Sequence, residues 1–132
     1  MIYLLDTNAW IAVLNPGDSP VKSRLSAHQP DEIALCSIVK AELFFGAYRS
    51  TKQAANLQLL ERLYRQFRSV PFDDAAAEVY GRIRADLAAR GTPIGPNDLM
   101  IAATALANNL ILVTHNTKEF SRVIGLILED WA

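Results

Sequence analysis

Four polar positions spread along the chain are of the types that hold a divalent cation. Asp6, Glu42 and Asp98 supply carboxylates, and Asn116 supplies an amide. Asp6 and Asn116 each follow a short apolar run, whereas Glu42 and Asp98 lie in or near the first turns of predicted helices. In an open parallel sheet, functional groups at such places collect beyond the carboxyl ends of the strands. We therefore expect the four side chains to converge on one edge of a sheet.

The surroundings of Glu42 point most directly to a site. Ile38 and Phe45 share its helical face, and a carboxylate on an apolar face is costly unless something satisfies it. Carboxylates forced together repel each other, and their pKa values rise unless a cation intervenes. Ligation by oxygen alone favours Mg²⁺ or Mn²⁺ over zinc. Such an ion can activate water and stabilise charge at a phosphodiester, which is the chemistry of metal-dependent nucleases.

Each acid also has a simpler interpretation. Asp6 could cap the first helix, and Asp98 could interact with the dipole of its own helix. Glu42 could pair at the surface with a cation such as Arg49. No single residue decides between these interpretations and a metal site, so the prediction rests on the set of four.

The composition predicts one globular domain over residues 1–132. Hydrophobic residues make up 51% of the chain and charged residues 20%, which allows a core and argues against disorder. The apolar runs are too short to cross a bilayer, so we expect no membrane association. Cys36 is the single cysteine, which excludes an internal disulfide and fits a reducing, cytoplasmic location.

The net charge of −1 is unusual for a nucleic-acid binder, which commonly has a basic excess. Any RNA contact must therefore come from a local patch of cations. Three basic residues flank the proposed site segments and are the candidates for phosphate contacts: Arg49, Lys118 and Arg122.

Strand and helix signals alternate along the chain. Apolar runs predict strands at 2–5, 33–36, 69–72, 111–114 and 126–128. Helices are predicted at 9–14, 22–27, 38–48, 52–67, 75–89 and 98–108. Ser37 is expected to be the N-cap of the third helix, and Asp73 and Asp74 to begin the fifth. This alternation is typical of an α/β fold with a mainly parallel central sheet flanked by helices.

Two apolar stripes exceed what a small domain can readily bury. The first lies on the 52–67 helix and comprises Leu57, Leu60, Leu63 and Phe67. The second lies one helix earlier and comprises Phe44, Phe45 and Tyr48. Large exposed patches usually mark interfaces, although both stripes could instead face the core.

Four segments resemble, in order and spacing, the motifs of the VapC toxins, which are PIN-domain ribonucleases of bacterial type II toxin–antitoxin pairs. These segments are Leu4–Asn8, Ser37–Leu43, Gly95–Ala103 and Val113–Phe120. The resemblance covers essentially the whole chain and implies a PIN-like three-layer sandwich. It also implies that Asp6, Glu42 and Asp98 are the acidic metal-site positions, with Thr7 as a polar residue beside them.

The resemblance implies a role for each acid. Asp6 and Asp98 would hold Mg²⁺ or Mn²⁺ directly, and Glu42 would ligate the ion or help to deprotonate water. Many PIN domains carry a fourth acid where this chain has Asn116, whereas VapC members resemble it in having asparagine there and an acid at the position of Glu119. Whether Asn116 or Glu119 completes the site is open, and so is the number of metal ions.

The function implied is that of a toxin endoribonuclease that hydrolyses phosphodiester bonds in tRNA or another structured RNA. Resemblance to VapC further implies a homodimer and a VapB-like antitoxin. The alternative is a non-catalytic PIN-like module that binds RNA or protein. A phosphotransfer enzyme of the haloacid-dehalogenase type is disfavoured, because the second aspartate that it needs is replaced here by Asn8.

Overall fold

The computed structural model describes residues 2–132 and contains one five-stranded parallel sheet, in the order β3-β2-β1-β4-β5. The strands are β1 (Tyr3–Leu5), β2 (Ile33–Cys36), β3 (Arg68–Val70), β4 (Ile111–Val113) and β5 (Leu128–Glu129). In the register of the sheet, Leu4 lies between Ala34 of β2 and Leu112 of β4. All five predicted strands are present, the last displaced toward the carboxyl terminus.

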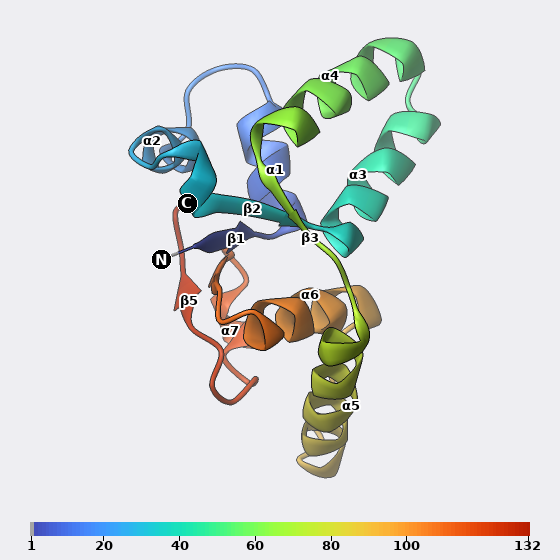
Figure 1. Ribbon diagram of the computed structural model, residues 1–132, viewed down its shortest axis with the longest axis vertical. Helices are drawn as coiled ribbons and strands as arrows, with labels where there is room; N and C mark the ends of the chain where they lie inside the picture. Colours follow the sequence, from blue (N-terminus) through green and yellow to red (C-terminus); the bar gives the residue numbers. More distant parts are fainter. Residues whose placement is uncertain (1) are drawn as a thin grey trace.

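Helices cover both faces of the sheet. They are α1 (Thr7–Leu14), α2 (Pro20–Ser26), α3 (Ser37–Arg49), α4 (Gln53–Gln66), α5 (Asp74–Ala89), α6 (Pro96–Ala107) and α7 (Thr117–Phe120), with a short 3₁₀ turn, η1 (Pro30–Glu32). Figure 1 shows α1 to α4 on one side of the sheet, and α5 and α6 on the other. The predicted three-layer α/β sandwich is therefore confirmed. None of these helices is long and apolar enough to span a membrane.

The residues that begin and end the helices account for most of the helix boundaries. Asp73 caps α5 by accepting a hydrogen bond from the N–H of Ala76 at 3.0 Å, as expected. The predicted N-cap at Ser37 is wrong, because β2 passes directly into α3 and Cys36 occupies the cap position without a side-chain bond. Ser37 is the first residue of the helix instead. The two short elements α7 and η1 were not predicted.

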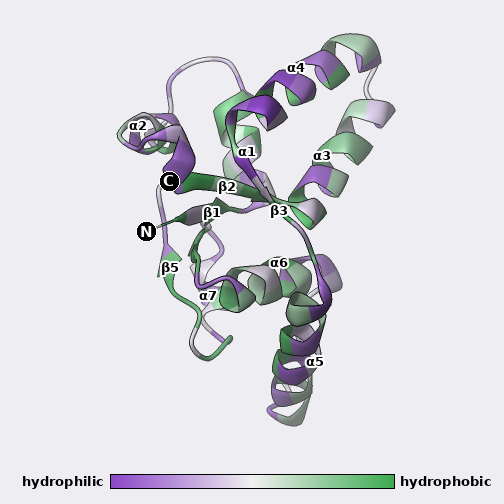
Figure 2. Ribbon diagram, in the orientation of Figure 1, coloured by the Kyte–Doolittle hydropathy of each residue, from purple (hydrophilic) through white to green (hydrophobic). Residues whose placement is uncertain are grey.

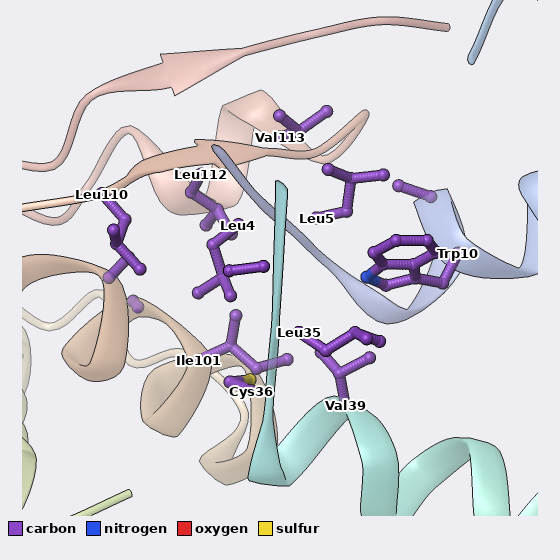
Figure 3. Packing of buried hydrophobic residues seen from close by; sticks show 14 of the residues in the cluster. Leu4, Leu5, Trp10, Leu35, Cys36, Val39, Ile101, Leu110, Leu112 and Val113 are labelled. Carbon is purple, nitrogen blue, oxygen red and sulfur yellow. The ribbon is translucent and has the colours of Figure 1, made fainter. Parts of the chain in front are cut away.

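The core lies on both faces of the sheet. Leu4 points toward Ile101 on α6, whereas Leu5 points toward Trp10 on α1 (Figure 3). Consecutive strand residues face opposite sides, and helices cover each side, so the central strands are apolar throughout. Figure 2 shows the same pattern, with hydrophobic residues throughout β2 and mixed residues on α4 and α5.

The two apolar stripes have different environments. In the first stripe, Leu60 and Leu63 are buried, and the flanking Leu57 and Phe67 pack against the core. In the second, the exposed fractions are 38% for Phe44, 62% for Phe45 and 59% for Tyr48. The first stripe therefore faces the core, and only the second remains a candidate interface.

Candidate functional site

Asp6 stands where β1 passes into α1. Its N–H donates to the carbonyl of Val113 at 3.0 Å, which ties it to the end of β4. Its Oδ1 accepts from the N–H of Ala9 at 2.9 Å, so Asp6 is indeed the N-cap of α1. Burial raises the pKa of Asp6 against the lowering effect of hydrogen bonds from Thr114 and Ala9, and the nearby Glu42 carboxylate raises it further. Asp6 therefore caps α1 and also belongs to a group of neighbouring carboxylates, Asp6, Glu42, Asp98 and Glu119, which we call the acidic cluster.

Glu42 is held by a neighbouring helix. The hydroxyl of Thr7 donates to Glu42 Oε1 at 2.6 Å and links α1 to α3. The alternative pairing with Arg49 is wrong, since the guanidinium of Arg49 lies over the ring of Phe45, 5.2 Å from its centroid. One carboxylate oxygen of Glu42 thus has a fixed partner from the segment that also carries Asp6.

Asp98 lies in the first turn of α6, which begins at Pro96. Burial raises its pKa to about 6, and the carboxylates of Glu119, Glu42 and Asp6 contribute to the rise in that order. All three acids are therefore close enough to act on Asp98. None of the four carboxylates takes part in an ion pair within residues 2–132.

Asn116 and Glu119 contact each other at the start of α7. The amide nitrogen of Asn116 donates to Glu119 Oε2 at 2.8 Å. The N–H of Asn116 donates to the hydroxyl of Thr114 at 3.0 Å, which anchors this loop to the end of β4. Among the neighbouring carboxylates, Glu119 has the largest charge effect on Asp98, so Glu119 lies near the other acids. Thr114 was not among the predicted site residues. Its one signal in the sequence is its place as a polar residue directly after an apolar strand.

In the part of the chain that the structure describes, no three acidic, histidine or cysteine side chains are already arranged to share one cation. Three of the acids are instead occupied by protein donors: Asp6 by Ala9, Glu42 by Thr7 and Glu119 by Asn116. The donor set is nevertheless made of oxygens from four carboxylates, and burial together with repulsion from the other three raises the pKa of Asp98. A hard divalent cation fits such a donor set chemically.

A hollow of about 640 Å³ opens beside the cluster. It lies between α1, α3 and the start of α6 and is lined by Thr7, Asn8, Ile11, Ile38, Ala41, Glu42, Phe45, Asn97 and Met100. Glu42 belongs both to the hollow and to the acidic cluster, and its hydrogen-bond partner Thr7 also lines the hollow. A polymer bound in the hollow would therefore contact the Glu42 carboxylate.

The three candidate RNA-binding cations lie on two different segments. Arg49 is the last residue of α3. Lys118 is in α7, next to Glu119, and the guanidinium of Arg122 donates to the carbonyl of Pro93 at 3.3 Å. The last contact ties the α7 segment to the loop that precedes α6 and Asp98.

The model of the PIN domain family matches residues 3–126. The chain belongs to the PIN-domain family. Within this family it is similar over nearly its whole length to VapC proteins. It is 39% identical to the tRNA(fMet)-specific endonuclease VapC of Shigella flexneri over 130 residues, covering 98% of each protein. It is also 39% identical to ribonuclease VapC2 of Rickettsia felis over 132 residues, covering 99% of this chain and 98% of the relative.

Solved structures show the same likeness in three dimensions. The PIN domain described here superposes with a TM-score of 0.91 on a chain of VapBC2 from Rickettsia felis bound to a fragment of promoter DNA, with 37% identity and complete coverage of both chains. The TM-score is 0.93 for DNA-bound VapBC from Salmonella typhimurium, at 35% identity, covering 100% of this chain and 99% of the other. The fold and family expected from the four sequence motifs are confirmed.

Proposed function

We propose that this PIN-domain protein is a metal-dependent endoribonuclease and the toxin of a type II toxin–antitoxin pair. One observation carries the proposal: Asp6, Glu42, Asp98 and Glu119 converge from four separate segments and have no cation partner within residues 2–132, and burial together with the other three carboxylates raises the pKa of Asp98 to about 6. Such an arrangement costs stability and is typical of a functional site. Its nearest chemical complement is Mg²⁺ or Mn²⁺.

The four acids have three roles in this mechanism. Asp6 and Asp98, the two whose pKa values are raised, would hold the ion. When bound, the ion supplies positive charge at the phosphodiester and lowers the pKa of water. Thr7 fixes one oxygen of Glu42, which leaves the other oxygen to accept a proton from the attacking water. Asn116 donates to Glu119 Oε2, and Glu119, which acts on the charge of Asp98, would complete the site as the fourth acid.

The similar proteins indicate the substrate and the partner. One relative is named a tRNA(fMet)-specific endonuclease, and the superposable structures are VapBC complexes. We propose a tRNA or another structured RNA as the substrate, a VapB-like antitoxin as the inhibitor and the cytoplasm as the place of action. Within the exposed patch of Phe44, Phe45 and Tyr48, the rings of Phe44 and Tyr48 are our candidate surface for a homodimer.

Cleavage of RNA by charge-neutral variants tests the proposal. Asp6→Asn, Glu42→Gln and Asp98→Asn should each lower the rate at limiting Mg²⁺ or Mn²⁺ by at least about a hundredfold, because a lost ligand removes several kcal/mol of stabilisation. Glu78→Gln, an exposed acid on α5, is the control and should cut at the wild-type rate. RNA ends are sequenced after incubation, with circular dichroism to verify folding.

Full cleavage by Asp98→Asn at limiting metal would show that the site is assigned wrongly. A wild-type protein that binds RNA but does not cut it, and whose melting temperature does not respond to Mn²⁺, would instead support the non-catalytic binding module.

The basic residues near the site should set the salt dependence of RNA binding. Lys118→Ala and Arg122→Ala should each reduce the slope of log K against log salt by about one unit or less, because each removes one phosphate contact. Arg65→Ala is the control, since Arg65 pairs with Glu61 on the surface of α4. Titrations of labelled RNA at several salt concentrations measure the slopes. A reduced slope for Arg65→Ala alone would move the RNA path to α4.

A further inference from the structure

The hollow beside the acidic cluster has the features of a base-binding pocket. Four apolar side chains, Ile11, Ile38, Phe45 and Met100, form much of its wall. Its volume of about 640 Å³ falls within the range of roughly 300–1,000 Å³ that is common for pockets that bind small ligands. Glu42 lies in the same wall, so a group held in the hollow would be adjacent to the proposed reaction centre.

Phe45 provides an aromatic surface at this position. It follows Glu42 by three residues on α3, so the two side chains share a helical face. The ring is 62% exposed, and the guanidinium of Arg49 lies 5.2 Å from its centroid. Proteins that bind single-stranded nucleic acids commonly use an exposed aromatic ring to stack on a base and a nearby arginine to contact a phosphate.

Two asparagines supply polar groups to the same hollow. Asn8 follows Asp6 by two residues, and Asn97 directly precedes Asp98. Both are exposed, and neither side-chain amide makes a hydrogen bond to another group of residues 2–132. A carboxamide presents a donor and an acceptor side by side, which matches the edge of a nucleobase.

We propose that this hollow holds an unpaired nucleobase of the substrate RNA, stacked on Phe45 and contacted at its edge by Asn8 and Asn97. Continuity with the acidic cluster favours this occupant, because a base in the hollow would place its own phosphate beside Glu42. The inference rests on the proposed ribonuclease function and adds the pocket that selects an unpaired nucleotide next to the scissile bond.

Phe45→Leu tests the stacking surface. The variant should raise KM by about five- to a hundredfold with little change in kcat, which is the loss expected for one stacked base. Tyr80→Leu is a matched control, because Arg84 lies over the Tyr80 ring at 5.8 Å with the same spacing of four residues, and Tyr80 does not line the hollow. Its KM should stay within about twofold of the wild type.

Substrates with one abasic nucleotide locate the base. Once the cut is mapped, an abasic residue is moved through the flanking positions of the RNA. At one position it should raise KM for the wild type and for Tyr80→Leu, but not further for Phe45→Leu. At that same position Asn97→Ala should weaken the preference among the four bases, which a packing defect would not do.

The outcomes separate the two proposals. Cleavage with an unchanged KM in Phe45→Leu overturns the pocket and leaves the ribonuclease function standing. An unchanged KM together with a shift from dimer to monomer in light scattering assigns Phe45 to the protein interface and also overturns the pocket. If the wild type cuts no RNA, the function fails, and binding of the abasic RNA series in EDTA still decides whether Phe45 holds a base.

Discussion

Two clusters of ionisable residues border β1, and they are built in opposite ways. Around Tyr3, the rings of His28 and Trp131 stack in parallel at 5.2 Å, and Arg24 lies over Trp131 at 5.5 Å. Glu129 there accepts hydrogen bonds from both Arg24 and the indole of Trp131. We call these five residues the tryptophan cluster.

The acidic cluster after Leu5 has no such balance. Its carboxylates are those of Asp6, Glu42, Asp98 and Glu119. Burial raises the pKa of Asp98 to about 6, and repulsion from the other three carboxylates contributes to the rise. One cluster satisfies its charges internally, whereas the other keeps charges that only an added cation would balance. The tryptophan cluster therefore stabilises the fold, whereas the acidic cluster lowers the free energy of unfolding of the metal-free protein. Such a loss of stability is expected at a site that serves a function.

The largest effect on stability should come from the tryptophan cluster. Trp131 is 2% exposed, so Trp131→Ala should lower the free energy of unfolding by about 3 to 5 kcal/mol through the cavity it leaves. Urea unfolding in EDTA measures this, with Ile124→Ala as the control because Ile124 is 73% exposed. A loss below about 1 kcal/mol would remove the contrast between the two clusters.

The acidic cluster should respond in the opposite sense. The pKa of Asp98 is higher in the folded protein than in the unfolded chain, so wild-type stability falls as pH rises from about 4 to about 6. Above about pH 6, the ionised Asp98 carboxylate lowers the free energy of unfolding by its full amount. Asp98→Asn removes it and should stabilise the metal-free protein at pH 7 by about 1 to 2 kcal/mol, a value reduced for partial exposure.

At pH 4 most of this stabilisation should disappear, since the Asp98 carboxyl is then protonated in the folded wild type and partly protonated in the unfolded chain, where its pKa is 3.8. Unfolding curves in EDTA at pH 4 and pH 7 check both statements. Excess Mn²⁺ should stabilise the wild type more than Asp98→Asn. A variant that is less stable than the wild type at pH 7 in EDTA would mean that Asp98 serves the helix dipole rather than a metal.

The smallest effect is expected at the rim of the tryptophan cluster. The side chain of Arg24 is 52% exposed and that of Glu129 is 34% exposed, and their ion pair spans 3.4 Å. Arg24→Gln should therefore cost less than about 1 kcal/mol, and the cost should shrink in high salt. A loss as large as that of Trp131→Ala would show that charge rather than packing holds this cluster.

The sequence was sufficient to predict the sheet and the convergence of Asp6, Glu42 and Asp98. β2 and β4 are buried on both faces, so their runs of apolar residues are unambiguous, and Glu42 was conspicuous among apolar neighbours. It was not sufficient to predict α7, which spans only four residues and follows an asparagine with no side-chain cap. Because α7 was missed, the choice between Asn116 and Glu119 stayed open.

The partner of Glu42 was also beyond the reach of sequence patterns. Arg49 is seven residues away on the same helix and was a natural candidate, yet the bond is made by Thr7, 35 residues away. Local spacing describes neighbours on one helix, whereas the approach of α1 to α3 depends on how Trp10 and Val39 pack on the sheet. Contacts of this kind follow from the three-dimensional arrangement alone.

The order of the strands divides the protein into two halves along the middle of the sheet. β1 and β4 are neighbours, but β1 to β3 precede the loop at residues 90–95 and β4 and β5 follow it. Asp6 and Glu42 belong to the first half, and Asp98 and Glu119 to the second. A cut in that loop leaves each fragment with two of the four carboxylates and one newly exposed edge of the sheet. All four carboxylates therefore come together only when the two fragments associate, through pairing of β1 with β4 and packing of α5 on α6.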